Sequence, residues 1–144
     1  MIHAPSGLAA LLLLTACPGP REPKQEKPTV PAATITDREW ALVALGNQPA
    51  PGGRGKRSAT LRLEAKDSHA AGFAGCNHFR ASFTLAADSL RFGPALATKM
   101  ACADGDDLER SFLAVLPLVT TFEATDSALI LKGAGEPLAR FRAR

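Results

Sequence analysis

The segment from Gly72 to Cys102 constrains the fold most, because it combines turn-forming glycines, an alternating strand pattern and two cysteines. Gly72 lies in a strand-like run, where glycine usually marks a bulge or a close approach of backbones. Gly75, Cys76 and Asn77 follow, and glycine and asparagine both tolerate turn geometry. We therefore expect a tight corner between two strands at these three residues.

Residues 78–85 show the alternation of a half-buried strand, with apolar side chains on one face and Arg80, Ser82 and Thr84 on the other. Similar short runs continue to the C-terminus, whereas the Gly- and Pro-rich stretch 46–55 is predicted to be a loop. Several short strands at near-regular spacing predict an antiparallel sheet curled into a barrel or half-barrel. The expected strands are 40–45, 60–65, 70–74, 79–85, 89–92, 119–124, 128–132 and 137–142.

One helix is expected after position 102, where apolar residues change to helical spacing. Asp106 and Glu109 resemble a capping box, whose side chains would bond the first free backbone N–H groups. Pro117 should end or kink this helix. Its apolar stripe, which includes Leu108 and Phe112, is better explained by core packing than by partner binding. The predicted class is mainly β (α+β), with one helix packed across the curled sheet.

Cys76 and Cys102 allow three interpretations. In an exported chain they would form a disulfide, and closing that loop would contribute roughly 3–4 kcal/mol on the chain-entropy model. Two buried free thiols that pack as small hydrophobes are the alternative. A metal site made from these cysteines and His78 has only three candidate ligands and lacks paired C-x-x-C spacing. We favour the disulfide, and expect neither a metal nor another cofactor.

The motif GCNxF, followed by ATxMAC and directly by a helix, resembles the META/HslJ domain family. Trp40 with Leu42 near the domain start, and the two closing strands, agree with this resemblance, which covers residues 34–142. The family is best known from a bacterial heat-shock protein, often occurs as exported lipoproteins, and is linked to stress and antibiotic tolerance. The resemblance therefore implies a fold and a setting more than a mechanism. The motif residues are Gly75, Cys76, Asn77, Thr98, Met100 and Cys102.

The N-terminus is typical of a lipoprotein signal peptide over residues 1–16. Residues 8–14 form an apolar run that is too short to span a bilayer. Leu14-Thr15-Ala16-Cys17 fits a lipobox, so Cys17 is the expected site of lipidation and membrane attachment. The segment departs from the usual pattern in one respect, because its positive charge comes only from His3 and the amino terminus.

This interpretation divides the chain into three parts. Residues 1–16 are the signal peptide, and residues 17–33 are the lipidated Cys17 with a tether rich in proline and charge. Residues 34–144 are the folded META/HslJ-like domain. The expected location is the cell envelope, on the periplasmic side of the inner or outer membrane or on the cell surface.

The sequence offers no catalytic arrangement that has the required spacing. His69 and His78 are the two histidines after the signal peptide, and a serine–histidine–aspartate set chosen from composition alone has no weight without geometry. The loop 46–55 lacks the spacing of a phosphate-binding loop. The net charge of +3 is mildly basic, but export and the lack of exposed aromatic residues argue against a nucleic-acid partner. We expect a protein that is not an enzyme.

Two binding functions remain open, beside a purely structural domain that has no ligand. The first is a binding or interaction module in envelope stress or maintenance, whose partner would be an envelope protein. The second is a carrier of a small apolar ligand, held inside the curled sheet. A carrier needs an enclosed apolar cavity of some hundreds of Å³, whereas a module needs a filled core and an exposed apolar or basic patch.

Overall fold

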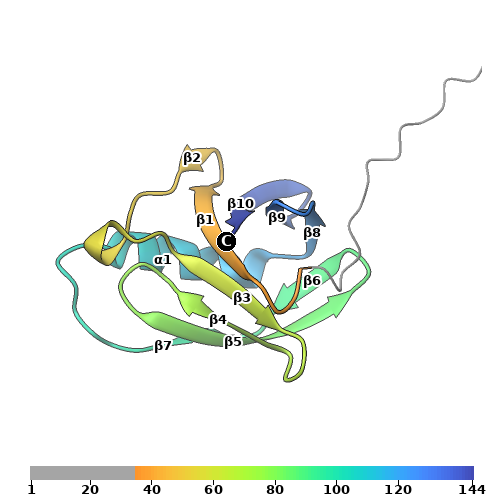
Figure 1. Ribbon diagram of the computed structural model, residues 1–144, viewed down its shortest axis with the longest axis horizontal. Coiled ribbons are helices and arrows are strands. Elements are labelled where there is room, and N and C mark those ends of the chain that lie inside the picture. Colours follow the sequence, from red (N-terminus) through yellow and green to blue (C-terminus); the bar gives the residue numbers. More distant parts are fainter. Residues whose placement is uncertain (1–34) are drawn as a thin grey trace, which may run out of the picture.

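The computed structural model describes residues 35–144 (Figure 1). The predicted signal peptide, Cys17 and the tether lie outside the described residues. Within residues 35–144, no helix is long and apolar enough to cross a membrane. The strands are β1 (Glu39–Leu45), β2 (Gln48–Pro49), β3 (Thr60–Glu64), β4 (His69–Phe73), β5 (His78–Ala86), β6 (Ser89–Phe92), β7 (Leu96–Ala97), β8 (Thr121–Ala124), β9 (Ala128–Gly133) and β10 (Glu136–Ala143).

The sheet closes into an antiparallel barrel, which confirms the predicted curled sheet. The strands of the barrel follow the order β1-β3-β4-β5-β6-β8-β9-β10, and β10 then pairs with β1. Residues Trp40 and Ala143 are partners at this closing pair, as are Leu45 and Ala139. The sequence left a half-barrel open, because the pairing of the first with the last strand has no local signal.

Alternation decides which side chains fill the barrel. In β5, Phe79, Ala81 and Phe83 are buried, while Arg80, Ser82 and Thr84 are exposed. A side chain that lined a water-sized internal cavity would retain accessible surface, yet the largest core residues have less than 2%. The barrel interior is therefore filled. These residues are Trp40, Phe73, Phe112, Phe141, Ile35, Leu61, Leu63, Leu90, Leu116, Leu129, Leu131 and Val119.

Helix α1 (Asp106–Val115) lies at one end of the barrel and continues into the 3-10 turn η3 (Leu116–Leu118), which contains Pro117 (Figure 1). Phe112 inserts into the core, where its ring makes edge contacts with Phe79 at 5.5 Å and Phe141 at 6.0 Å between centroids. This confirms that the apolar stripe of the helix packs into the core.

The capping-box prediction is wrong. Gly105, in the left-handed conformation, occupies the N-cap position of α1, and no side chain caps this end. The carboxylate of Glu109 instead bonds to the corner between β4 and β5. A sequence window cannot distinguish these two uses of a glutamate in a first turn, because the second partner is distant in the chain.

Two further expectations need correction. The stretch 46–55 is not wholly loop, since β2 pairs with β1 and a short 3-10 turn, η2 (Arg54–Lys56), begins within it. The two-residue strand β7, which pairs with β5, has no counterpart among the predicted strands. Both strands are too short to show a repeating pattern. Gly72 behaves as expected, because a Cβ atom there would lie 2.0 Å from the Thr60 carbonyl oxygen.

Candidate functional site

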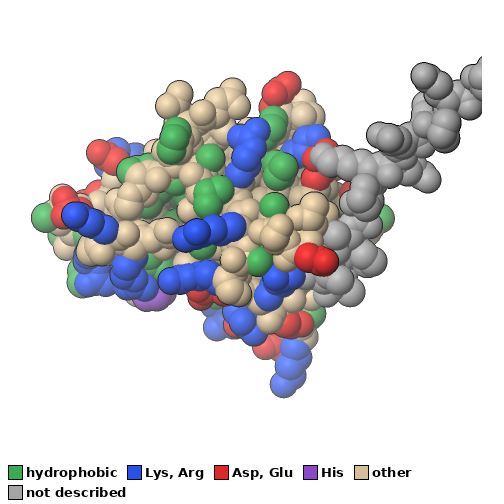
Figure 2. Space-filling model, turned by 45° about the horizontal axis from the view of Figure 1, so that its top comes forward, with side chains coloured by type: hydrophobic (Ala, Val, Ile, Leu, Met, Phe, Trp, Pro, Cys, Tyr) green, Lys and Arg blue, Asp and Glu red, His purple; other side chains and the backbone are tan. Residues whose placement is uncertain are grey.

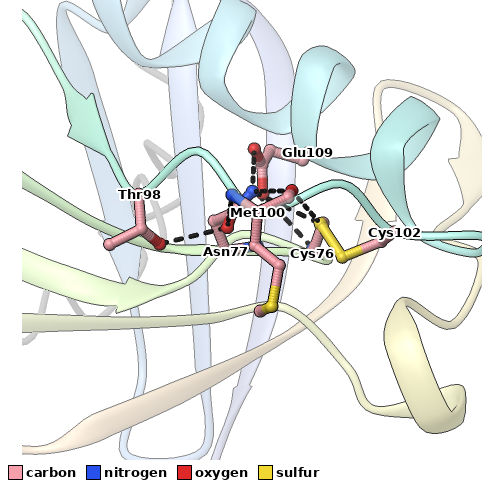
Figure 3. Close-up of a disulfide and its surroundings, with 6 residues drawn as sticks. All are labelled: Cys76, Asn77, Thr98, Met100, Cys102 and Glu109. Atoms are coloured by element: carbon pink, nitrogen blue, oxygen red, sulfur yellow. Dashed lines mark hydrogen bonds between the residues drawn. A yellow bond between two sulfur atoms is a disulfide. The ribbon is translucent and has the colours of Figure 1, made fainter.

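The family motif residues meet at the corner between β4 and β5 (Figure 3). Cys76, at this corner, is disulfide-bonded to Cys102, with 5.9 Å between their Cα atoms and 26 residues between them in sequence. Cys76 is buried and Cys102 is partly exposed. The bond ties the corner to the segment that runs into α1.

Asn77 uses both the oxygen and the nitrogen of its side-chain amide to hold that segment. Its Oδ1 accepts hydrogen bonds from the Met100 N–H at 2.9 Å and from the Thr98 hydroxyl at 3.1 Å. Its Nδ2 donates to the Met100 carbonyl and to Glu109 Oε1, both at 3.1 Å. The residue is only 4% exposed, and a buried amide is stable when its donors and acceptors are satisfied in this way.

Glu109 joins α1 to the same corner. Its Oε2 accepts hydrogen bonds from the backbone N–H groups of Cys76, at 3.3 Å, and of Asn77. Bonds from N–H groups to a carboxylate are stronger than those between neutral groups. We call this arrangement the corner clamp, and its members are Cys76, Asn77, Thr98, Met100, Cys102 and Glu109.

Three glycines allow the chain to pack tightly beside the corner clamp. A Cβ atom on Gly53 would lie 2.3 Å from the Gly75 carbonyl oxygen, and one on Gly105 would lie 2.4 Å from the same atom. Gly75 itself has φ +130°, which L side chains rarely adopt. The Arg54 N–H donates to the Gly75 carbonyl at 2.7 Å. These contacts bring the loop before β3, the corner and the start of α1 together.

A metal-binding role does not fit the corner clamp in its oxidised form. Cys76, Cys102 and Asp106 place one ligand atom each within 4.8 Å of one another. The sulfur atoms, however, are bonded to each other, so neither is the thiolate that a metal site would use. His78, the third ligand considered from the sequence, is exposed and its ring lies against Phe73 at 5.6 Å.

The clamped segment exposes two large apolar side chains. Leu96 is 77% exposed and Met100 is 50% exposed, and Thr98 and Lys99 between them are also exposed. The backbone of Met100 is held by Asn77 while its side chain points away from these bonds (Figure 3). The corner clamp thus presents a fixed backbone with exposed apolar side chains, which we call the 96–100 segment.

A surface depression of about 1040 Å³ lies next to the corner clamp. It separates the loop at residues 51–56 from the start of α1, and both charged and apolar groups line it. Asp107 and Arg110 on its helical side pair with each other at 2.9 Å.

The fold and the corner clamp together define a small β-barrel domain that is closed by a helix and cross-linked at one corner. The model of the META domain family matches residues 33–144, and the chain therefore belongs to this family, which confirms the resemblance. A search among curated proteins finds no significant match.

Solved structures share this fold. An NMR structure of a protein from Burkholderia xenovorans is 27% identical, with a TM-score of 0.66, and the match covers 87% of this chain and 98% of that chain. A second NMR structure of a protein is 18% identical, with a TM-score of 0.60, and the match covers 78% and 94% of the two chains. The second similarity concerns the fold alone.

All the motif residues named from the sequence lie in or beside the corner clamp, whereas Cys17 lies outside the described residues. Sequence reasoning missed the role of Glu109 and the packing of Gly53 and Gly105 against Gly75. Glu109 carried only a local signal, its place in the first turn of a predicted helix, and that signal pointed to a cap. The two glycines carried only the general signal of a turn.

Proposed function

We propose that this protein is a lipid-anchored component of the cell envelope whose META domain acts as a non-enzymatic binding module in envelope stress or maintenance. The observation that carries the proposal is the combination of a filled barrel with the exposed 96–100 segment. A module of this kind needs a surface that keeps its shape without the partner, because ordering a loop on binding reduces affinity.

The filled interior favours the module over the carrier. The largest core side chains have less than 2% of their surface accessible, and the described depressions are lined by surface loops, strand ends and the outer face of the sheet. A carried apolar ligand would have to displace packed side chains such as Trp40 and Phe112. Displacing them would cost several kcal/mol, which a small ligand would have to recover.

The corner clamp supports a binding role for the 96–100 segment. Its polar side chains are occupied in holding the backbone, as the bonds of Asn77 and Glu109 illustrate. The side chains left to meet a partner are Leu96, Met100 and the charged Lys99, and Met is frequent on adaptable binding surfaces. We infer an envelope protein as the partner, because a protein surface can cover Leu96 and Met100 together.

Membrane attachment rests on Cys17, at the end of the lipobox. Replacing Cys17 by Ser in the full chain should move the protein from the membrane fraction to the soluble fraction. Unchanged partitioning would reject the anchor. Because this substitution leaves the META domain intact, it separates the question of location from the question of binding.

The binding surface can be tested in cells with a photo-crosslinking amino acid. Placed at Leu96 or Met100, it should yield a discrete adduct of defined mass, and Leu96→Asp should abolish the adduct formed from position 100. Ala87, an exposed turn residue between β5 and β6, is the control position and should give none. Equal labelling from position 87 would contradict a specific surface.

A further inference from the structure

An arginine-rich face covers the outside of β10, β1, β3, β4 and β5. Two rows of side chains cross these strands, as their register shows. In one row Arg62 is paired with Ala71, and Ala71 with Arg80. In the other row Arg142 is paired with Ala41, and Ala41 with Thr60. Figure 2 shows Lys and Arg side chains in excess of Asp and Glu over this side of the molecule.

The rows form a shallow groove because the residues between the arginines are small. Ala71 and Gly72 make the floor of a depression of about 190 Å³, which Arg57, Arg62 and Arg144 also line. Neighbouring strands lie roughly 4.8 Å apart, so Arg62 and Arg80 stand about 10 Å apart on either side of β4. The groove is smaller than a usual small-ligand pocket and is open along the sheet.

Contacts with neighbouring side chains hold two of these guanidinium groups in place. The guanidinium of Arg57 lies over the Phe73 ring at 4.1 Å, and Arg144 bonds to Glu39 at 2.8 Å. Within residues 35–144, neither Arg62 nor Arg80 forms an ion pair, although Glu39 stands opposite Arg62 in the register of β1 and β3. Both guanidinium groups therefore remain open to a ligand.

The charge of the molecule is concentrated on this face. The two rows, with Arg57 and Arg144 beside them, carry five arginines and one acidic residue, Glu39, which gives +4, whereas the whole chain carries +3. The remaining residues thus sum to −1, since 3 minus 4 is −1. Glu64 borders the face one row beyond Arg62. The arginines are Arg57, Arg62, Arg80, Arg142 and Arg144.

The chemistry of these residues indicates phosphate. All five cations are arginines, whose planar forks match phosphate oxygens in a bidentate manner better than lysine does. They are spread along a shallow groove that is open along the sheet, which can meet several anionic groups at once but cannot enclose one small ligand. We propose that this face docks on the anionic phospholipid headgroups of the membrane that holds the protein.

This inference rests on the proposed function, because the lipid on Cys17 would hold the domain near headgroups. Residues 17–33, the expected tether, would keep the domain near the headgroups, because seventeen residues span at most roughly 60 Å even when fully extended. A tether of this length gives a high local concentration of headgroups, so a face with low affinity for them suffices to orient the domain. Docking would place the 96–100 segment beside the membrane, because Leu96 pairs with Arg80 at the edge of this face.

Vesicle binding of the full chain carrying Cys17→Ser tests the face without the lipid. The protein should co-sediment with phosphatidylcholine vesicles that contain phosphatidylglycerol, and not with phosphatidylcholine alone. Binding should fall steeply at high salt, because the Debye length shortens to about 3 Å at 1 M. Partitioning should fall roughly fivefold for each arginine removed, so Arg62→Gln with Arg80→Gln should lower it roughly 25-fold.

The matched control is Lys66→Gln with Arg91→Gln, which removes the same charge from exposed positions outside the face. It should retain most of the binding, and circular dichroism should show both double variants folded. An equal loss in the control, or no preference for phosphatidylglycerol, would overturn the proposal. Tighter binding to alginate, a soluble anionic polysaccharide, would overturn the lipid assignment. Whether Cys17 anchors the protein is tested separately, by fractionating cells that express the chain with Cys17 intact.

Discussion

The barrel interior and the corner clamp hold the protein together by opposite means. The interior consists of many apolar side chains from all the barrel strands and α1, which share the burial among them. The corner clamp consists of one disulfide and a few hydrogen bonds that converge on Asn77 and Glu109. The first is a distributed, non-directional contribution to stability, whereas the second depends on a handful of directional groups.

This difference shows how the domain separates folding from presentation. A filled core gives the barrel its stability but leaves its surface undefined. The corner clamp adds little apolar area, yet it fixes where the 96–100 segment lies relative to β5 and α1. We therefore expect core substitutions to change global stability, and clamp substitutions to change both stability and the shape of that segment.

The largest effect should come from Phe112, the residue that connects α1 to the barrel. Phe112→Ala removes a fully buried ring that contacts Phe79 and Phe141, and should lower the free energy of unfolding by about 3–5 kcal/mol. Chemical denaturation measures this loss. The control Ala114→Gly, at an exposed position of the same helix, should cost about 1 kcal/mol. Equal losses would show that the helix is not anchored through the core.

The disulfide should come next. Reducing a loop that spans 26 residues, or replacing Cys76 and Cys102 by Ala, should cost roughly 3–4 kcal/mol on the chain-entropy model. Both proteins should carry Cys17→Ser, so that no other thiol can exchange with the pair. Denaturation gives the energy, and mass spectrometry after alkylation gives the redox state. Two alkylated cysteines in the untreated protein would contradict the bond.

Glu109 tests the polar half of the corner clamp. Glu109→Ala leaves the N–H groups of Cys76 and Asn77 without their acceptor, and should cost about 1–3 kcal/mol. Asp107→Ala is the control, because it also removes a carboxylate from the first turn of α1. If the two variants lost equal stability, Glu109 would act only through the helix dipole. Amide exchange should show increased opening of residues 96–102 in Glu109→Ala alone.

The comparison also explains how much of the fold the sequence could predict. Burial patterns are local, so the alternation in 78–85 and the helical stripe around Phe112 predicted the strand and the helix with nearly correct bounds. Closure of β10 on β1 could not be predicted in the same way. It pairs Trp40 with Ala143, and no local pattern distinguishes two strands that meet from two that remain edges.

The candidate site was predictable only in part, for the same reason. Cys76 and Cys102 could be proposed as a pair because few cysteines were available. Asn77 was predicted as a turn residue, but its bonds to Thr98 and Met100 depend on how the later segment returns to the corner. The role of Glu109 was misassigned, because a carboxylate can accept hydrogen bonds equally well from its own helix end and from a distant segment. Which of the two it does depends on the three-dimensional arrangement of the segments.

The smallest effects should be those of surface ion pairs, and they set the lower limit of the comparison. Arg110 and Asp107 are 75% and 94% exposed, whereas Lys132 and Glu123 are 24% and 39% exposed. Double-mutant cycles with alanine should give a coupling of about 0.3 kcal/mol for the first pair and at most about 1 kcal/mol for the second. Added salt should abolish the first coupling and only reduce the second, because dissolved ions screen exposed charges more fully than partly buried ones. A coupling at the exposed pair as large as the loss in Glu109→Ala would mean that burial is not what makes the polar contacts of the corner clamp strong.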